Sequence, residues 1–316
     1  MDLVSIDDVR SAADNLSGVA VRTPVVACPW LGESSDLWLK LENQQPIGAF
    51  KLRGAYHAIS RLAPDQRARG VVTHSSGNHG QAVGYAARAL GVSATVVMPD
   101  GSVPLKVERV RQFGARVELV PVSERLSAAQ RLAETHGYAM IPPYDHPDVI
   151  AGQGTVGLEI LEQVPDVAVI LAPVGGGGLI SGIATAVKAL RPEVAVIGVE
   201  PAYAADAADS LRAGRLVPWP DADRVRTVAD GLRTNLAERT FAHIAARVDD
   251  IVTVTDDQIL DTVRVLARQA NVVAEPSGAV TTAAYRFRRD RLPAGRTVAV
   301  VSGGNIDPAL LATLTA

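Results

Sequence analysis

The sequence predicts an α/β protein in which parallel β-strands are covered by helices. From residue 71 onward, short apolar runs alternate with longer segments of helical spacing, which is the pattern of a parallel sheet. Three loops built from glycine or small polar residues directly follow strand-like runs, and open α/β sheets form their binding sites in such loops. At 316 residues the chain is long enough for two lobes or for one large α/β unit.

The elements before residue 62 are expected to be short. The first is an amphipathic helix before residue 15, with Ile6, Val9 and Ala12 at helical spacing. The others are strands at 23–25 and 37–41 and a helix at 54–62. The second of these strands leads toward the glycine-flanked segment 48–55.

Strands and helices alternate regularly in the rest of the chain. Strands are expected at 71–73, 94–98, 117–120, 167–172, 194–199, 251–255 and 297–301. Helices are expected at 80–90, 105–113, 123–135, 149–161, 179–190, 256–270 and 278–287. Residues 210–230 are rich in Asp, Arg, Pro and Gly, which predicts a long irregular connection.

Composition excludes several classes of protein. The formal net charge is −3, so there is no electrostatic reason to expect nucleic acid or an anionic membrane as a partner. Cys28 is the only cysteine, which rules out an internal disulfide and a cysteine-based zinc site. The N-terminus lacks the regions of a signal peptide, and no apolar run approaches the length of a membrane span. We therefore expect a cytoplasmic protein and, because the chain stops soon after the last strand, no C-terminal regulatory domain.

The first loop whose residues indicate a binding function is the four-glycine loop, formed by Gly175, Gly176, Gly177 and Gly178. Its backbone N–H groups are unobstructed, and the following helix adds its positive N-terminal end, so the loop suits a phosphate. The alternative is a tight turn for close strand–helix packing, which needs only one or two glycines. The dinucleotide and Walker patterns are absent, so the loop indicates a single phosphate and not NAD or ATP.

Two further loops offer polar groups at strand ends. Residues 74–80 (HSSGNHG) supply hydroxyls, an amide and backbone donors at a helix start, where an amino-acid carboxylate binds well. An N-cap pair for the following helix is the alternative, and His79 alone is weak evidence. Ser302 ends an apolar strand, where it either forms one hydrogen bond at the base of a pocket or acts as a cap.

Lys51 lies beside Phe50 in the glycine-flanked segment 48–55 (GAFKLRGA). A buried lysine has a lowered pKa, and the neutral amine forms Schiff bases with carbonyl groups such as that of pyridoxal phosphate. Most lysines are solvated surface charges, which is the alternative for this one when the segment is considered alone.

Taken together, these segments resemble the serine/threonine dehydratase and serine racemase family of fold type II pyridoxal-phosphate (PLP) enzymes. The resemblance covers nearly the whole chain. Its motifs lie in order at 40–43 (KLEN), 48–55, 74–82, 150–155 (IAGQGT), 175–179, 229–231 and 302–305. It implies two α/β lobes with PLP between them, the smaller at 50–141 and the larger formed by 1–49 and 142–316. It also implies a homodimer.

The resemblance implies a role for each cofactor residue. Lys51 would hold PLP as a Schiff base and take the substrate α-proton. Phe50 would pack near the pyridine ring, and the four-glycine loop would bind the phosphate. Asn78 would hydrogen-bond the ring hydroxyl and Ser302 the ring nitrogen. A serine does not keep that nitrogen protonated, which favours elimination.

The resemblance places the substrate-binding residues in the loop that follows the predicted strand 71–73. Ser75, Ser76, Gly77, Asn78 and His79 would hold the substrate carboxylate. Ser76 aligns with the serine that acts on the opposite substrate face in racemases, so it is also a candidate catalytic residue.

A divalent cation is the second implied cofactor. Glu200, Asp206 and the backbone carbonyl of Ala204 match the cation ligands of the racemase-like branch. These hard oxygen donors suit magnesium, calcium or manganese. A solvated acidic turn is the alternative.

The implied reaction is PLP-dependent β-elimination from a small hydroxy amino acid, L-threonine or L-serine, to a 2-oxo acid and ammonia. The alternatives are a serine racemase, or a dehydratase of L-threo-3-hydroxyaspartate or of a hydroxyectoine-breakdown intermediate. Tyr144 matches bacterial dehydratases better than animal racemases. A PLP-fold binding protein without turnover is the non-enzyme alternative, against which Lys51, the four-glycine loop and Ser302 argue.

Overall fold

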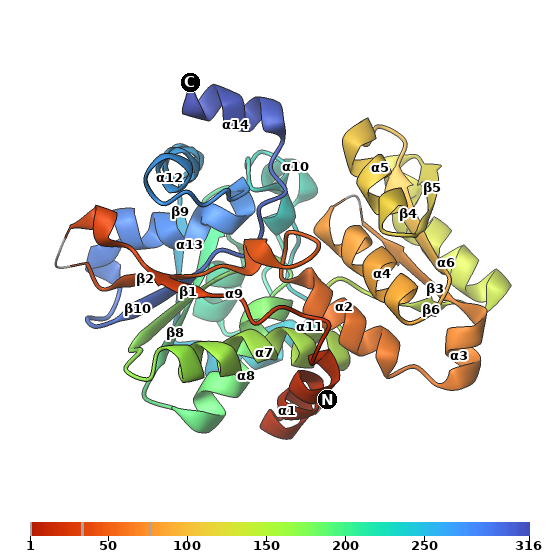
Figure 1. Ribbon diagram of the computed structural model, residues 1–316, viewed down its shortest axis with the longest axis horizontal. Coiled ribbons are helices and arrows are strands. Elements are labelled where there is room, and N and C mark those ends of the chain that lie inside the picture. Colours follow the sequence, from red (N-terminus) through yellow and green to blue (C-terminus); the bar gives the residue numbers. More distant parts are fainter. Residues whose placement is uncertain (1, 33–34, 76) are drawn as a thin grey trace.

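The computed structural model describes residues 2–32, 35–75 and 77–316, and its strands form two sheets (Figure 1). The six-stranded sheet has the order β1 (Val25–Ala27), β2 (Leu37–Lys40), β10 (Thr297–Val300), β7 (Val169–Pro173), β8 (Ala195–Pro201), β9 (Asp250–Val254). The four-stranded sheet has the order β5 (Arg116–Val120), β4 (Ala94–Pro99), β3 (Val71–His74), β6 (Ala139–Met140). Every strand pair is parallel except β1 with β2, where Val25 opposes Lys40 across an antiparallel edge.

Helices cover both sheets. They are α1 (Ile6–Leu16), α2 (Lys51–Ser60), α3 (Pro64–Arg69), α4 (Asn78–Ala89), α5 (Pro104–Gln112), α6 (Arg125–His136), α7 (Pro147–Gln163), α8 (Gly178–Leu190), α9 (Asp206–Ala213), α10 (Asp221–Arg224), α11 (Glu238–Arg247), α12 (Asp256–Gln269), α13 (Pro276–Phe287) and α14 (Pro308–Thr315). Among the described residues, no helix is both long and apolar enough to cross a membrane.

The core is layered because successive residues of a strand point to opposite faces of its sheet. In β7, Val169 and Leu171 pack into the cluster that contains α12 and α13. Ile170 and Ala172 pack into the opposite cluster, with α7 and α8. Figure 1 shows these helix pairs on opposite sides of the six-stranded sheet. Burial on both faces explains why the predicted strands read as continuous apolar runs.

The two sheets meet along α2, which packs against both α4 and α7. Two glycines allow the backbones of α2 and α7 to approach closely. A Cβ at Gly152 of α7 would lie 2.7 Å from the Cα of Gly54 and 2.7 Å from the carbonyl oxygen of Arg53. Because α2 contacts helices of both sheets, the lobe boundaries at residues 50 and 141 stay a prediction.

The predicted α/β class with parallel sheets is confirmed, but several element ends and connections differ from prediction. The helix predicted at 54–62 begins at Lys51, so the lysine occupies the first turn of α2. The α-helices and strands of the described residues that are absent from the predicted order are α3, α9, α10, α11, α14 and β6. The segment 210–230, predicted to be irregular, begins inside α9 and contains α10. Side-chain contacts hold it, since the Trp219 indole N–H donates to Asp209 and Arg224 donates to the Trp219 carbonyl.

Candidate active site

One cavity of about 370 Å³ collects residues from three of the predicted loops and from the start of α2. Its lining includes every predicted cofactor and substrate residue that the structure describes: Phe50, Lys51, Ser75, Gly77, Asn78, His79, Gly175, Gly176, Gly177, Gly178 and Ser302. Ser76 lies outside the described residues. The three loops follow β3, β7 and β10, whose carboxyl ends point toward the cavity, as expected for parallel sheets.

Lys51 presents its amine to this cavity. The amine donates a 2.7 Å hydrogen bond to the Pro143 carbonyl and lies 5.0 Å from the centre of the Phe50 ring. Burial lowers the pKa of Lys51 to about 8, because the charged form is poorly solvated. A substantial fraction of the amine is therefore neutral near physiological pH, as Schiff-base formation requires.

The four-glycine loop has no room for side chains. A Cβ at Gly176 would overlap the Tyr144 ring, and one at Gly178 would lie 2.9 Å from the Tyr144 Cβ. Gly177 has a φ of +84°, and a Cβ there would lie 2.7 Å from Leu236. The loop is the N-terminal approach to α8, so its N–H groups and the helix dipole act together. This fits a phosphate and explains why glycine is needed throughout.

Asn78 is held by two neighbours from distant parts of the chain. Its side-chain amide donates a 2.6 Å hydrogen bond to Glu275, and its side-chain oxygen accepts a 2.7 Å hydrogen bond from Asn305. The Asn305 amide also donates to the Ile47 carbonyl at 2.8 Å. These contacts fix which way the Asn78 amide points and leave its second N–H hydrogen for a ligand.

Glu275 is a buried acid at the same end of the cavity. Burial, reinforced by the negative charge of Asp230, raises the pKa of Glu275 to about 7. The sequence gives no signal for this residue, which precedes α13 and reaches Asn78 only through the tertiary fold.

Ser302 lies at the base of the cavity and is 4% exposed. Its hydroxyl oxygen lies 3.5 Å from the Ser277 carbonyl oxygen, which is the outer limit of a hydrogen bond. The hydroxyl can therefore form a stronger hydrogen bond with a ligand. Its backbone carbonyl accepts a 3.1 Å hydrogen bond from the Phe50 N–H, which ties the start of α2 to the end of β10.

His79 contributes a neutral ring. One ring nitrogen lies 2.9 Å from the Ile141 carbonyl, which requires that this nitrogen carry the proton. Burial, with the charge of Lys51 as a second cause, lowers the pKa of His79 to about 3. His79 therefore does not supply a positive charge to a substrate carboxylate at neutral pH.

The residues predicted to bind a cation are buried and are not part of the cavity lining. Glu200 and Asp206 are 0% and 2% exposed, so they are not part of a solvated acidic turn. Glu200 accepts hydrogen bonds from the N–H groups of Ala207 and Ala208 at 3.0 and 2.8 Å. One oxygen of Asp206 accepts from the Leu236 N–H at 2.9 Å, and the other is buried without a hydrogen-bond partner among the described residues. No cluster of three or more His, Cys, Asp or Glu side chains suited to a metal occurs in the described part of the chain.

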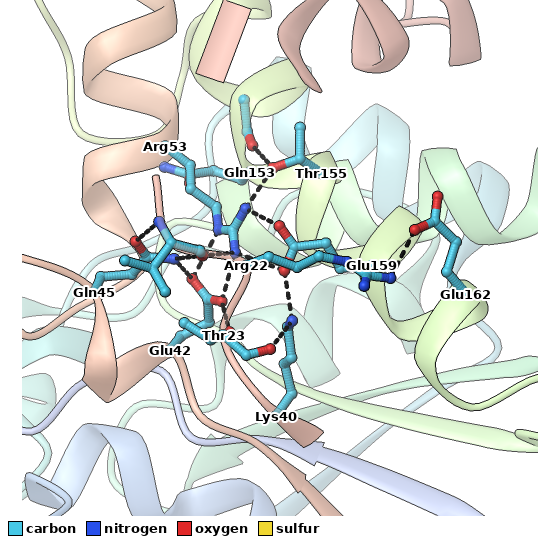
Figure 2. A network of polar contacts seen from close by, with 12 residues as sticks. Arg22, Thr23, Lys40, Glu42, Gln45, Arg53, Gln153, Thr155, Glu159 and Glu162 are labelled. Carbon is cyan, nitrogen blue, oxygen red and sulfur yellow. Dashed lines mark hydrogen bonds and ion pairs between the residues drawn. The ribbon is translucent and has the colours of Figure 1, made fainter. Parts of the chain in front are cut away.

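A buried network of charges surrounds Arg53 (Figure 2), which lies two residues after Lys51 in α2. The Arg53 guanidinium bonds both oxygens of Glu42 at 2.8 Å and both oxygens of Glu159 at 2.6 and 2.9 Å. Lys40 also donates to Glu159. Burial alone would lower the pKa of Arg53, but the two carboxylates outweigh it and raise the pKa. The network anchors α2 to β2 and α7, and with them the backbone that carries Lys51.

The cavity lining also contains charged residues that no sequence motif predicted. They are Asp145, Glu275, Lys106, Arg109 and Arg125, to which the motif at 229–231 adds Asp230. A charged residue on a surface helix gives no sequence signal of its own, because only the packing of that helix decides whether it faces solvent or a cavity.

A buried lysine amine and a glycine loop suited to a phosphate thus line one cavity, which is what a phosphorylated aldehyde cofactor requires. The family model described as "Pyridoxal-phosphate dependent enzyme" matches residues 16–303, and the chain belongs to this family. Within it, the chain belongs to the group of serine/threonine dehydratases and serine racemases of fold type II, as its relatives show.

Three similar proteins carry three different activities in their names. The chain is 40% identical over 312 residues to the L-threo-3-hydroxyaspartate ammonia-lyase of Saccharomyces cerevisiae, covering 97% of this chain and 95% of that protein. It is 42% identical over 314 residues to the L-threonine ammonia-lyase of Thermotoga maritima, covering 96% and 76%. The structure of maize serine racemase matches with a TM-score of 0.94 at 36% identity, covering 99% and 97%. Similarity therefore identifies the family and leaves the substrate open.

The residues present fit PLP. The four-glycine loop leaves space for a phosphate that any side chain would fill. The buried amine of Lys51 faces the same cavity. When bound, PLP supplies the electron sink that makes an amino-acid α-proton acidic.

Proposed function

We propose that this protein catalyses PLP-dependent β-elimination of a 3-hydroxy amino acid to a 2-oxo acid and ammonia. L-threonine and L-serine are the simplest substrates, and L-threo-3-hydroxyaspartate and a hydroxyectoine-breakdown intermediate are related ones. The observation that carries the proposal is the Lys51 amine, which faces one cavity together with the four-glycine loop and Ser302.

Lys51 has two tasks in this proposal. Lys51 would hold the cofactor aldehyde, and its neutral amine would accept the substrate α-proton. A pKa of about 8 makes the amine an effective base near neutral pH. General base catalysis of this kind contributes roughly 10²–10⁴-fold to the rate.

The other residues bind and orient. The N–H groups of the four-glycine loop hold the phosphate, and the free N–H of Asn78 donates to the ring hydroxyl. Ser302 meets the ring nitrogen with a neutral hydroxyl, which does not keep that nitrogen protonated. Ser75, Ser76, Gly77, Asn78 and His79 hold the substrate carboxylate at the start of α4, where the helix dipole favours an anion.

Serine racemisation is the second candidate. The maize relative supports it, and Ser76 would be the proton donor on the face opposite Lys51. The same binding residues serve both reactions, so product analysis must separate them.

We also propose a divalent cation, Mg²⁺, Ca²⁺ or Mn²⁺, on Glu200, Asp206 and the carbonyl of Ala204. The buried Asp206 oxygen without a partner among the described residues supports it, since a buried carboxylate is otherwise costly.

The proposal further includes a cytoplasmic homodimer with lobes at 50–141 and at 1–49 plus 142–316, acting on small amino acids and not on nucleic acid or membranes.

The test is an assay of PLP-loaded protein with magnesium, with L-serine, L-threonine and L-threo-3-hydroxyaspartate offered separately. Release of 2-oxo acid and ammonia supports elimination, whereas inverted substrate with little oxo acid supports racemisation. Bound cofactor without either product from any of the three substrates would contradict the proposal and favour a non-catalytic binding protein.

A further inference from the structure

A second cavity, of about 330 Å³, lies near the start of the chain. We call it the N-terminal cavity, and it is lined by residues 2–4, Asp8, Pro147, Asp148 and Arg239. Its walls therefore come from the segment before α1 and from the first turns of α1, α7 and α11. Helix α1 packs against α7 (Figure 1). Among the described residues, this cavity and the active-site cavity have no lining residue in common.

Hydrogen bonds hold the segment 2–4 in place as one wall of the N-terminal cavity. The Val4 N–H donates to Nε2 of His243 at 2.9 Å, and the Arg239 guanidinium donates to the Asp2 carbonyl at 3.3 Å. Because Nε2 of His243 accepts, its Nδ1 carries the proton and donates to the Arg239 carbonyl at 2.8 Å. Both ring nitrogens of His243 are thus used, and the segment 2–4 is tied to α11.

The N-terminal cavity has a cation and an anion on its walls, and neither has a close ionic partner. The nearest carboxylate to Arg239 among the described residues is that of Asp145, at 4.0 Å. Asp148 lies 3.8 Å from Arg61 and 3.9 Å from the His146 ring. Charged hydrogen bonds are about 2.7–2.9 Å long. Both Arg239 and Asp148 are therefore able to bind a ligand group of opposite charge.

The surroundings give this cavity a positive side and a negative side. Arg239 lies in the first turn of α11, where the helix dipole disfavours a cation and favours an anion. Asp2 and Asp8 add negative charge to that of Asp148. His146 does not neutralise these acids, because its Nδ1 accepts a 3.2 Å hydrogen bond from the Asp148 N–H and burial lowers its pKa.

We propose that the N-terminal cavity binds a zwitterionic amino acid with an apolar side chain. The ligand carboxylate pairs with Arg239 at the start of α11, and the ligand ammonium group pairs with Asp148. Leu3, Val4 and Pro147 supply apolar lining for the side chain. The volume lies within the range of small-molecule sites.

The bound amino acid acts on the active site through the segment 143–148. The Pro143 carbonyl accepts the hydrogen bond from the Lys51 amine, and Asp145 lines the active-site cavity. A ligand carboxylate on Arg239 competes with Asp145 for the guanidinium, so the charge of Asp145 is less balanced. That charge opposes binding of the substrate carboxylate and raises KM. This kinetic consequence rests on the proposed function, whereas binding in the N-terminal cavity does not.

L-proline is the probe for the site. It is a zwitterion with an apolar ring, and its secondary amine forms no neutral imine with the cofactor aldehyde. Pyrrolidine carries only the ammonium group and cyclopentanecarboxylate only the carboxylate. Calorimetric titration of the PLP-loaded protein should show that L-proline binds at least 10-fold more tightly than either analogue. Absence of L-proline binding, or equal binding of either analogue, overturns the zwitterion site.

Variants locate the binding. Loss of one charged hydrogen bond in Arg239→Gln or in Asp148→Asn should weaken L-proline binding roughly 10- to 100-fold. Arg10→Gln is the matched control, because Arg10 lies on α1, is paired with Asp7 and does not line the cavity. It should bind L-proline as the wild type does. Wild-type affinity in Arg239→Gln and Asp148→Asn overturns the assignment to this cavity.

Kinetics test the coupling between the two cavities. Saturating L-proline should raise KM for L-threonine about fivefold or more at unchanged kcat, which is the usual size of coupling between sites. Arg239→Gln should lose this response. An unchanged KM in the wild type, or a rise in KM that survives in Arg239→Gln through competition at the active site, overturns the coupling. If no hydroxy amino acid is turned over, the proposed function fails, and calorimetry still decides the site.

Discussion

Asn78 and Glu275 join the two sheets through one 2.6 Å hydrogen bond between side chains 197 residues apart. Asn78 is the first residue of α4 on the four-stranded sheet, and Glu275 is the N-cap of α13 on the six-stranded sheet. The bond leaves one amide hydrogen of Asn78 directed into the cavity, so the carboxylate positions a residue proposed to contact the cofactor ring.

Glu275→Ala should therefore disturb the cofactor more than Glu275→Gln. The glutamine keeps an oxygen that accepts from Asn78, whereas alanine lets the amide rotate. We expect a shifted cofactor absorbance and a lower kcat in Glu275→Ala, with Glu275→Gln close to the wild type. Indistinguishable spectra for the wild type and Glu275→Ala would show that Asn78 needs no such support.

The raised pKa of Glu275 also predicts a pH dependence of stability. A carboxyl group with a folded-state pKa of about 7 binds its proton more tightly when folded than when unfolded. Its contribution to the free energy of unfolding therefore falls as pH rises from its ordinary value, near 4.5, to about 7, by at most about 1.4 kcal/mol per pH unit. Urea unfolding of the wild type and Glu275→Gln between pH 4.5 and 8 measures this. The stability of the variant relative to the wild type should increase over that interval, and a constant difference would contradict the shift.

Lys51→Ala should abolish both turnover and the absorbance of lysine-bound cofactor. Lys188→Ala, which removes a lysine of α8 paired with Asp249, is the control that should keep both. Because only the neutral amine reacts with an aldehyde, the rate at which cofactor-free wild type takes up PLP should rise with pH through about 8. Retained activity in Lys51→Ala would end the proposed mechanism.

Gly176→Ala should weaken PLP binding at least tenfold, since the new methyl group would overlap the Tyr144 ring and displace the loop. Gly101→Ala is the control, because a Cβ at Gly101 meets nothing within 4 Å. Equilibrium titration of both cofactor-free variants with PLP measures the effect. An unchanged affinity in Gly176→Ala would show that the loop tolerates a side chain.

Glu42→Ala should destabilise the fold by about 3–5 kcal/mol, because it leaves the buried Arg53 without one of its two carboxylates. The exposed pair Arg10–Asp7 provides the comparison, and Arg10→Ala should cost less than about 1 kcal/mol. Denaturant unfolding followed by circular dichroism tests both. Equal losses of unfolding free energy in Glu42→Ala and Arg10→Ala would show that the buried Arg53 network contributes no more to stability than an exposed ion pair.

Removal of divalent cations should lower the melting temperature, and the loss should be larger at pH 8 than at pH 6. Burial, with the charge of Asp206 as a second cause, raises the pKa of Glu200 well above its usual value. Burial also raises the pKa of Asp206 to about 6, so protons compete with the cation as pH falls. Asp206→Asn should abolish the response to magnesium, whereas the exposed Asp257→Asn should keep it. A magnesium response that survives in Asp206→Asn places the cation elsewhere.

The sequence alone determined the chemistry that depends on short stretches of backbone. Four consecutive glycines after an apolar strand provide anion-binding N–H groups wherever the strand lies, and Lys51 follows Phe50 directly in the chain. Strand positions were predictable for the same reason, because alternation of strands and helices is a local pattern. Short helices such as α9 and α10 were not, since contacts of Trp219 and Arg224 hold them and local spacing does not.

Only the tertiary structure decided which distant side chains meet. Glu275 reaches Asn78, Tyr144 packs on Gly176, and Arg53 meets Glu159 only because the fold brings together segments that are far apart in the chain. Arg125 faces that cavity because of how α6 packs on its sheet, and no residue near it in the chain specifies this. Burial, which shifts the pKa of Lys51 and of Glu275, is likewise a property of the packed molecule, so the chemistry of these groups follows from the fold.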